Sequence, residues 1–289
     1  MQSERTCQAS LKTNFTFRVS AWGGPPAREK CAVSPAGASY YEAIMTRIAR
    51  CALMFTVCLT AGIVRGEDRS LPQPRVVTPG VTDSAPPSDA VVLFNGHDTS
   101  EWTREDGSPI KWALQSGTLL VRTGTGDAYT KRKIASAQIH IEFDVPYMPA
   151  QHDQARGNSG IFLQGRYEIQ ILDSYQNPTY ADGSCGALYN EYAPLVNACR
   201  KPEHWQTYDI IFHAPKCSPD SKVLTPGDVT VLQNGVLVQD HVRIKGPTDE
   251  ALDQHVCDAG PLRLQDHVYP PGTITPMRFR NIWYRPLAE

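Results

Sequence analysis

The sequence predicts an all-β protein of the jelly-roll β-sandwich type. From residue 91 onwards, short apolar or alternating runs follow one another, and turn-forming residues separate them. No stretch longer than a turn or two keeps the spacing of an amphipathic helix. The chain also contains 23 prolines, and proline can neither donate a backbone hydrogen bond nor sit comfortably inside a helix. About ten strands with regular turns indicate two packed antiparallel sheets.

Two segments show the strand signals most clearly. Residues 138–145 alternate polar and apolar side chains, as a strand with one solvent-exposed face must. Asn234-Gly235 is the strongest hairpin signal in the chain, because both central residues of such a turn must tolerate positive φ. A second hairpin is expected to turn at Gly165. In chain order, the expected strands are 91–94, 111–114, 118–121, 138–145, 160–164, 166–172, 208–213, 229–233, 236–238, 262–265 and 277–283.

The charge of the chain argues against one class of partner. Its formal net charge is -2, and 20% of its residues are charged, whereas a nucleic-acid-binding protein normally shows a basic face. The basic run Lys131-Arg132-Lys133 is interpreted as a solvated strand end rather than a phosphate site. We therefore expect no nucleic-acid partner.

The N-terminal part of the chain is predicted to be a targeting segment rather than a folded domain. A short basic start after Met45, an apolar stretch over 51–64 and small residues near Gly66 are typical of a secretory signal. The apolar stretch is shorter than the ~20 residues that a membrane-spanning helix needs. Residues 45–66 are therefore interpreted as a signal peptide, which implies a periplasmic or secreted protein with no membrane insertion after cleavage. Residues 1–44 are interpreted as untranslated or as a disordered extension, and a long extended signal is the alternative.

Residues 67–90 are expected to form a linker before the folded domain. The segment holds five prolines among Ser, Thr and Asp residues, and such a composition favours an extended chain over a packed one. The domain itself is expected over residues 91–289.

The cysteines after the linker are Cys185, Cys199, Cys217 and Cys257. They form no Cys-x-x-Cys pair, so a zinc site is not expected. Disulfides are the natural state of cysteines in an exported protein. Four cysteines allow three pairings, and we favour Cys185–Cys199 with Cys217–Cys257 because each bond closes one surface loop.

Two of the expected strands carry a polar face that suits sugar hydroxyls. The side-chain period of two sends Arg166, Glu168 and Gln170 to one side of their strand and the apolar residues between them into the core. Arg263 and Gln265 are sent outward from a later strand in the same way. This polar face is either plain solvent-exposed surface or a binding groove. For Glu168 and Arg263, an ordinary cross-strand ion pair is the alternative to a functional role.

Loop residues next to these strands supply further candidates. His267 follows Asp266 at a strand end, where catalytic groups usually sit, although a lone loop histidine is more often a plain surface residue. Asn158 lies in a turn that either fixes a loop or contacts ligand, and Asp173 is a candidate for accepting backbone hydrogen bonds in its loop. The tryptophans Trp102, Trp112, Trp205 and Trp283 are expected in the core rather than as sugar platforms.

A series of short motifs runs in order through residues 91–287, and the motifs are specific as a set. They are 93–96 (LFNG), 156–164 (RGNSGIFLQ), 166–175 (RYEIQILDSY), 186–189 (GALY), 193–197 (APLVN), 205–209 (WQTYD), 260–267 (GPLRLQDH) and 278–283 (RFRNIW). The set resembles the 3-keto-disaccharide hydrolase domain family, which implies a concanavalin A-like or laminin-G-like jelly roll. The sequence departs from the family pattern at residues 268–275. The shape of the site's rim, and with it the size of the substrate, is therefore not determined by the resemblance.

The resemblance implies an enzyme that cleaves 3-keto-glycosides by a lyase/hydratase route. A keto group at carbon 3 makes the hydrogen on carbon 2 acidic. The site therefore needs a base, a cation or donors for the enolate oxygen, and an acid for the leaving oxygen. We expect Glu168 as the base, Arg263 as the cation and His267 as the acid. The expected substrate-binding residues are Asn158, Arg166, Gln170, Asp173, Tyr189 and Gln265.

Two other functions stay open at this point. Direct glycoside hydrolysis would use two carboxylates at a set separation, with Asp173 or Asp266 as the possible partner of Glu168. A lectin-like module that binds carbohydrate without changing it is the non-enzymatic alternative. In each case the partner is a carbohydrate. We expect no cofactor and no metal, since no run of acidic ligands is visible, and the oligomeric state stays open.

Overall fold

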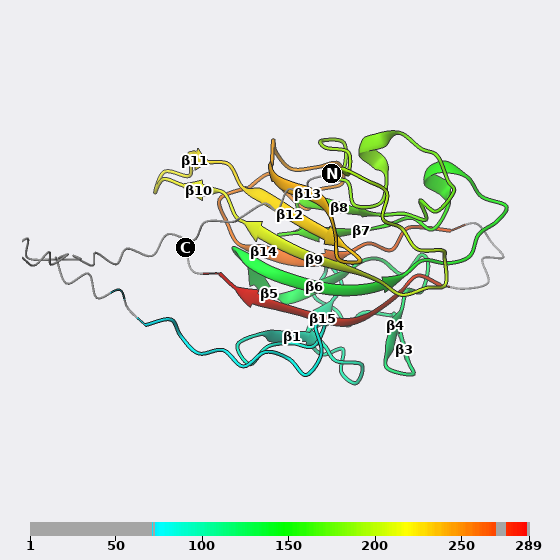
Figure 1. Ribbon diagram of the computed structural model, residues 1–289, viewed down its shortest axis with the longest axis horizontal. Helices are drawn as coiled ribbons and strands as arrows, with labels where there is room; N and C mark the ends of the chain where they lie inside the picture. The colour runs from blue at the N-terminus through cyan, green and yellow to red at the C-terminus, as the bar shows by residue number, and fades with distance from the viewer. Residues whose placement is uncertain (1–70, 72, 270–275, 288–289) are drawn as a thin grey trace, which may run out of the picture. The chain divides into compact units, whose positions relative to one another are not determined.

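Two antiparallel sheets enclose the hydrophobic core, as the sequence predicts (Figure 1). The strands are β1 (Val91–Phe94), β2 (Trp102–Thr103), β3 (Ala113–Gln115), β4 (Thr118–Leu120), β5 (Ala128–Ile134), β6 (Ala137–Asp144), β7 (Ser159–Leu163), β8 (Tyr167–Ile171), β9 (Gln206–His213), β10 (Lys216–Cys217), β11 (Val223–Thr225), β12 (Asp228–Gln233), β13 (Val236–Arg243), β14 (Gly260–Leu264) and β15 (Arg278–Pro286). The larger sheet has the order β13-β12-β9-β6-β15-β4-β3, and β1 pairs with β15. The smaller sheet has the order β2-β5-β14-β7-β8, while β10 and β11 pair separately.

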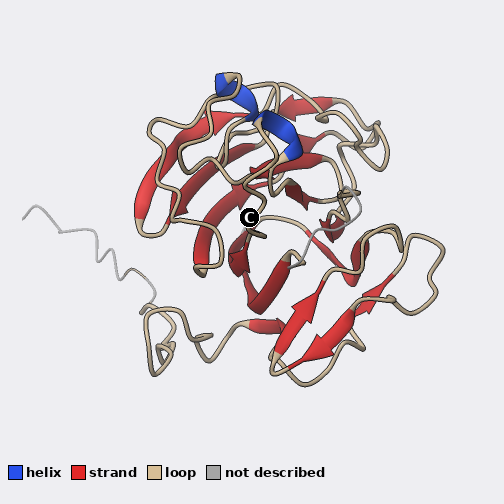
Figure 2. Ribbon diagram, turned by 90° about the vertical axis from the view of Figure 1, so that its right-hand side faces the viewer, coloured by secondary structure: helices blue, strands red, loops and turns tan. Residues whose placement is uncertain are grey.

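This computed structural model describes residues 71, 73–269 and 276–287. The predicted signal peptide, residues 45–66, and the preceding residues 1–44 lie outside the described residues. The short helical turns η2 (Asp153–Ala155) and η3 (Ala181–Gly183) lie in loops outside the sheets (Figure 2). Among the residues described, no helix has the length and apolar character needed to cross a membrane.

The described part of the predicted linker forms no helix or strand, but hydrogen bonds hold it against β15. The carbonyl oxygen of Ser84 accepts hydrogen bonds from Nδ2 of Asn281 at 2.8 Å and from Nε1 of Trp283 at 3.0 Å. Asp89 forms an ion pair with Arg285 at 2.7 Å. This part of the chain is therefore fixed to the outer face of the larger sheet.

The alternation predicted for residues 138–145 is seen in β6. Ile141 and Phe143 point into the core and are fully buried. On the opposite face, His140 stacks on Trp283 with ring centroids 5.2 Å apart, and its Nδ1 lies 2.6 Å from Asp209. The outer face of this sheet is thus covered by its own side chains and by the N-terminal segment.

Both predicted hairpins are confirmed, whereas the strands β2, β5, β10 and β11 were missed. Asn234 and Gly235 adopt positive φ, 53° and 80°, between the paired strands β12 and β13. Gly165, with φ of 69°, joins the paired strands β7 and β8. The longest of these is β5, whose apolar pattern is interrupted by Lys131-Arg132-Lys133. All three basic side chains lie inside β5 and are exposed.

One of the two expected disulfides is present. Cys217 and Cys257 are bonded and link β10 to the loop before β14. The predicted bond between Cys185 and Cys199 is wrong for this structure, since both carry free thiols. Their sulfurs are nevertheless close, because Nε2 of Gln233 donates a hydrogen bond to each, at 3.4 and 3.2 Å. That shared hydrogen-bond donor satisfies the two buried thiols without a covalent bond.

Candidate active site

A row of side chains crosses the face of the smaller sheet that points away from the core. Tyr129 of β5 is paired with Arg263 of β14. Arg263 is paired in turn with Phe162 of β7, which is paired with Glu168 of β8. Residues directly opposite one another in antiparallel strands point to the same face, so these side chains lie side by side. The outward orientation of Glu168 and Arg263 follows the sequence pattern, and Phe162 separates the two.

A polar cavity of about 170 Å³ opens on this face beside Glu168. It is lined by Asn158, Glu168, Gln170, Tyr189, Asp249, Glu250, Gln265 and His267. Pockets for drug-sized ligands measure about 300–1,000 Å³. This cavity, called the Glu168 pocket below, therefore suits one small polar unit such as a single sugar ring.

Strand β8 and its neighbour β7 fix the position of Glu168. Tyr167 and Ile169 on either side of it fill the core, which turns Glu168 to the outer face. Its side chain is nevertheless only 4% exposed. The carboxylate fits against β7 because Gly160, two residues before the paired Phe162, has no side chain; a Cβ there would collide with Oε1 of Glu168.

The wall of the pocket that carries Tyr189 runs beside β8 like a short additional strand. The amide of Gln170 donates to the carbonyl of Ala187, and the amide of Tyr189 donates to the carbonyl of Glu168, each at 3.0 Å. Leu188 forms a bridge with Ile169 between these two bonds. This backbone pairing holds Tyr189 next to Glu168.

A second wall comes from the loop before β14, which carries Asp249 and Glu250. Thr248 ties it to β8, because its hydroxyl accepts a hydrogen bond from the amide of Glu168 at 3.0 Å and donates one to the carbonyl of Arg166 at 3.0 Å. The guanidinium of Arg166 forms an ion pair with Asp253 of the same loop at 2.7 Å. Arg166 is only 3% exposed. It therefore anchors the loop and does not line the pocket, where the sequence prediction placed it.

Three buried polar atoms of the lining have no hydrogen-bond partner in the described part of the chain. They are Oε1 of Gln170, Oε1 of Gln265 and Nδ1 of His267. Buried polar groups in proteins are nearly always paired, so an unpaired one needs an explanation. The amide nitrogens of the two glutamines are already used, by Gln154 at 3.1 Å and by Glu250 at 2.8 Å. The carbonyl oxygens of the two glutamines are therefore the acceptors that stay without a partner.

The two titratable candidates in the pocket have pKa values that are shifted in opposite directions. Burial raises the pKa of Glu168 to about 8, and the nearby negative charge of Glu250 adds to the increase. Burial lowers the pKa of His267 below its ordinary value. Near neutral pH the free site therefore favours a protonated Glu168 and an uncharged His267.

Arg263 lies beside the pocket rather than in its lining. Its Nε forms an ion pair with Asp127 at 2.5 Å, and its Nη1 donates to the backbone carbonyl of Glu250. The guanidinium also packs over the ring of Phe162, 4.1 Å from the centroid. In the described part of the chain, Glu168 has no ion-pair partner, and the simple Glu168–Arg263 pair considered from the sequence is not formed. Arg263 instead holds the loop that carries Glu250.

Six of the nine sequence-predicted site residues meet in this pocket. Arg166 and Arg263 support it from outside, and Asp173 lies elsewhere, in an ion pair with Arg156 at 2.8 Å. Asp266, a possible second carboxylate, accepts hydrogen bonds from the amides of Thr125 and Gly126 and does not line the pocket.

Sequence reasoning missed Asp249 and Glu250, although both line the pocket. Both lie in a loop whose sequence shows no strand or helix periodicity. The only sequence signal that could have indicated them is that two acidic residues stand next to each other. No group of three or more His, Cys, Asp or Glu side chains in the described residues is arranged to hold a metal ion.

The fold and the pocket together define a carbohydrate-active β-sandwich protein. The profile of the 3-keto-alpha-glucoside-1,2-lyase-like domain matches residues 89–285. The chain belongs to this family, which confirms the resemblance seen in the sequence.

Solved structures agree with this assignment. One is a protein from Parabacteroides distasonis described as a candidate glycosyl hydrolase, with 45% sequence identity and a TM-score of 0.68. The alignment covers 75% of this chain and 93% of that one. A second candidate glycosyl hydrolase from the same organism has 18% identity and a TM-score of 0.50, over 69% of this chain and 94% of that one, and supports the fold alone. No curated protein matches the chain.

Proposed function

We propose that the protein is an exported enzyme that cleaves 3-keto-glycosides by elimination across carbons 1 and 2, followed by addition of water. The observation that supports this best is the presence, in one small pocket, of a carboxyl group with a raised pKa and an imidazole with a lowered pKa. Groups whose pKa values are pushed apart in this way can supply a proton donor and a proton acceptor at the same pH.

In the proposed reaction, the base removes the hydrogen from carbon 2 and negative charge develops on the ketone oxygen at carbon 3. The electron pair then forms a double bond between carbons 1 and 2, while the bond from carbon 1 to the leaving oxygen breaks. The acid gives its proton to that oxygen. Water adds to carbon 1 and carbon 2 regains a proton, which releases the 3-keto sugar.

The protonation states of the free site favour His267 as the base and Glu168 as the acid near neutral pH. This reverses the roles expected from the sequence. Glu168 would act as the base only in its ionised fraction, which grows as the pH rises towards about 8. Hydroxyls of the substrate would donate hydrogen bonds to the free oxygens of Gln170 and Gln265.

Tyr189 takes the role of ketone-oxygen donor that the sequence suggested for Arg263. Tyr189 lines the pocket, and its hydroxyl lies 2.6 Å from the hydroxyl of Tyr180. When Tyr180 donates to Tyr189, the proton of Tyr189 is available for the substrate. Arg263 then acts as a positioning residue, through Asp127 and the backbone of Glu250.

Direct hydrolysis is a second candidate function, because Asp249 and Glu250 share the pocket with Glu168. The charge of Glu250 already contributes to the raised pKa of Glu168. A protonated carboxylic acid next to ionised carboxylates is the arrangement that glycoside hydrolysis uses.

Incubating the purified protein in D2O with a 3-keto-glucoside and with the corresponding ordinary glucoside tests both functions. Elimination predicts cleavage of the keto substrate alone and deuterium at carbon 2 of the product. Cleavage of the ordinary glucoside without deuterium at carbon 2 would establish direct hydrolysis instead. Binding of glycans without turnover of either compound would establish the lectin-like module.

The export part of the proposal is supported by the Cys217–Cys257 disulfide, since stable disulfides are typical of oxidising compartments. N-terminal sequencing of protein collected from the periplasm or the medium should give a mature chain that begins near Glu67. An intact Met1 in that material would contradict the proposed signal peptide.

A further inference from the structure

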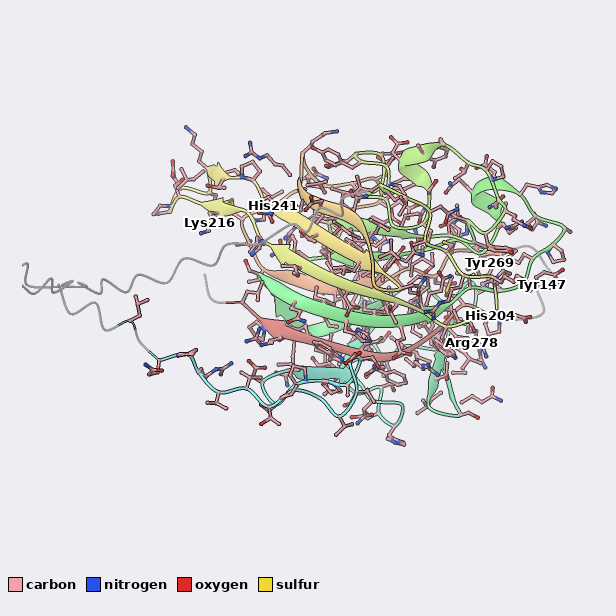
Figure 3. The ribbon with its side chains drawn as sticks, viewed as in Figure 1. Tyr147, His204, Lys216, His241, Tyr269 and Arg278 are labelled. Carbon is pink, nitrogen blue, oxygen red and sulfur yellow. A yellow bond between two sulfur atoms is a disulfide. The ribbon has the colours of Figure 1, made fainter. Side chains whose placement is uncertain are left out.

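A second and larger cavity lies at one end of the sandwich. Its volume is about 630 Å³, compared with about 170 Å³ for the Glu168 pocket, and the two share no lining residue. Three segments form it: the loop after β6, the loop after β8 and the segment before β9. Figure 3 shows Tyr147 and His204, both in its lining, at the end of the sandwich opposite Lys216 and His241. This site is called the end cavity below.

The floor of the end cavity is a charge-neutral ion pair. Arg156 and Asp173 are joined by an ion pair of 2.8 Å, and the carboxylate of Asp173 is 2% exposed. The other carboxylate oxygen accepts the amide of Tyr175 at 3.1 Å, and Nη2 of Arg156 donates to the carbonyl of Tyr175. Since each charge of the floor is already compensated, the floor favours no ionic ligand.

The rim combines aromatic rings with mixed charges. Tyr147 is 55% exposed, and Tyr175, also in the lining, has the ammonium group of Lys201 5.8 Å from its ring centroid. Glu203 stands two residues from Lys201 on the same rim, so the rim adds no net charge. Flat aromatic faces match the apolar C–H face of a sugar ring, and the polar groups around them match its hydroxyl edge.

We propose that the end cavity is a second carbohydrate site, separate from the Glu168 pocket, which binds a neutral sugar unit of a longer glycan. Tyr147 supplies the stacking surface, and Lys201 and Glu203 hydrogen-bond the ring hydroxyls. The volume accommodates more than the single unit that fits the Glu168 pocket. The sequence predicted a sugar-binding role for Asp173. In this proposal Asp173 instead forms part of the floor of the end cavity and supports the residues that bind the sugar.

Isothermal titration calorimetry with cellotetraose, maltotetraose and laminaritetraose tests the proposal on the full chain carrying Glu168→Gln, which slows turnover. At least one tetrasaccharide should bind, and adding Tyr147→Ala should weaken its binding about tenfold, as loss of a stacking aromatic does. Lys201→Ala should weaken the same binding, whereas Lys222→Ala, at an exposed lysine outside the cavity, should not.

A 3-keto-glucoside that fills the Glu168 pocket should not compete with the tetrasaccharide. In the protein with Glu168 intact, Tyr147→Ala should leave turnover of a small 3-keto-glucoside unchanged. Loss of glycan binding in the end cavity and loss of catalysis in the Glu168 pocket can therefore be measured independently. Absence of binding by all three tetrasaccharides would overturn the proposal, as would unchanged affinity in both cavity variants. Tighter binding of oligogalacturonate than of every neutral tetrasaccharide would overturn its neutral-ligand part.

Discussion

The carboxylate of Glu168 occupies the space that a side chain at residue 160 would fill, so the glycine on β7 sets the position of the acid on β8. A methyl group at Gly160 would collide with Oε1 of Glu168 and lie 2.9 Å from its Cδ. Positive φ plays no part, since Gly160 lies within the regular strand β7. The same methyl group would lie 2.9 Å from the ring of Phe162, so the glycine is required by the close approach of two side chains, Glu168 and Phe162.

Gly160→Ala should fold but lose activity. An alanine suits the strand backbone, and the flexible end of Glu168 can move aside, which displaces the carboxyl group from its place. Turnover of a 3-keto-glucoside should fall by ~10²-fold, the effect of misplacing a reacting group by about 1 Å. Gly246→Ala, where an added methyl group meets open space, is the matched control. Unchanged turnover in Gly160→Ala would show that this position of Glu168 is not needed for the reaction.

The pH profile of kcat/KM should report the shifted pKa values of Glu168 and His267. Activity should decline above about pH 8, as Glu168 loses its proton, and below the ordinary histidine pKa of 6.5, as His267 gains one. Glu168→Gln should lower turnover by ~10²–10⁴-fold and abolish the alkaline decline. Asp220→Asn, at an exposed carboxylate outside the pocket, should keep both limbs. A profile that rises through pH 8 would instead assign Glu168 as the base.

Glu168 should also make stability depend on pH. Its pKa is about 8 in the folded protein against 4.5 ordinarily. Between these values the folded state binds more protons than the unfolded state, so the free energy of unfolding falls as the pH rises. Glu168→Gln removes this loss. Its stability relative to the wild type should therefore increase from about pH 5 to about pH 9, by on the order of a few kcal/mol.

Urea unfolding of both proteins at the two pH values measures this difference. Glu203→Gln, which removes an exposed carboxylate, is the control for the loss of a charge that stays in water. An equal stability difference at both pH values would contradict the burial of Glu168 as an acid.

The sequence predicted the elements whose pattern is local. Alternation gave the outward side of Glu168, Gln170 and Gln265, and the dipeptide Asn234-Gly235 gave its hairpin. The sequence pattern could not predict which residue pairs with each charged side chain. Arg166 and Arg263 face outward as expected, yet loop carboxylates that are distant in sequence neutralise both. Loop residues such as Glu250 follow no period, so their place in the pocket depends on tertiary contacts.

The four cysteines after residue 67 should divide into one disulfide and two thiols. Cys217 and Cys257 are bonded over a separation of 40 residues, whereas Cys185 and Cys199 lie buried or half-buried beside the amide of Gln233. Replacing Cys217 and Cys257 by serine should destabilise the fold by about 2–4 kcal/mol, because the bond restricts the unfolded chain. Iodoacetamide should modify Cys185 only after unfolding, because the core shields it. Mass spectrometry of alkylated native and denatured protein separates the possibilities. Two disulfides in native material would restore the pairing that the sequence suggested, and rapid labelling of Cys185 in the folded protein would contradict its burial.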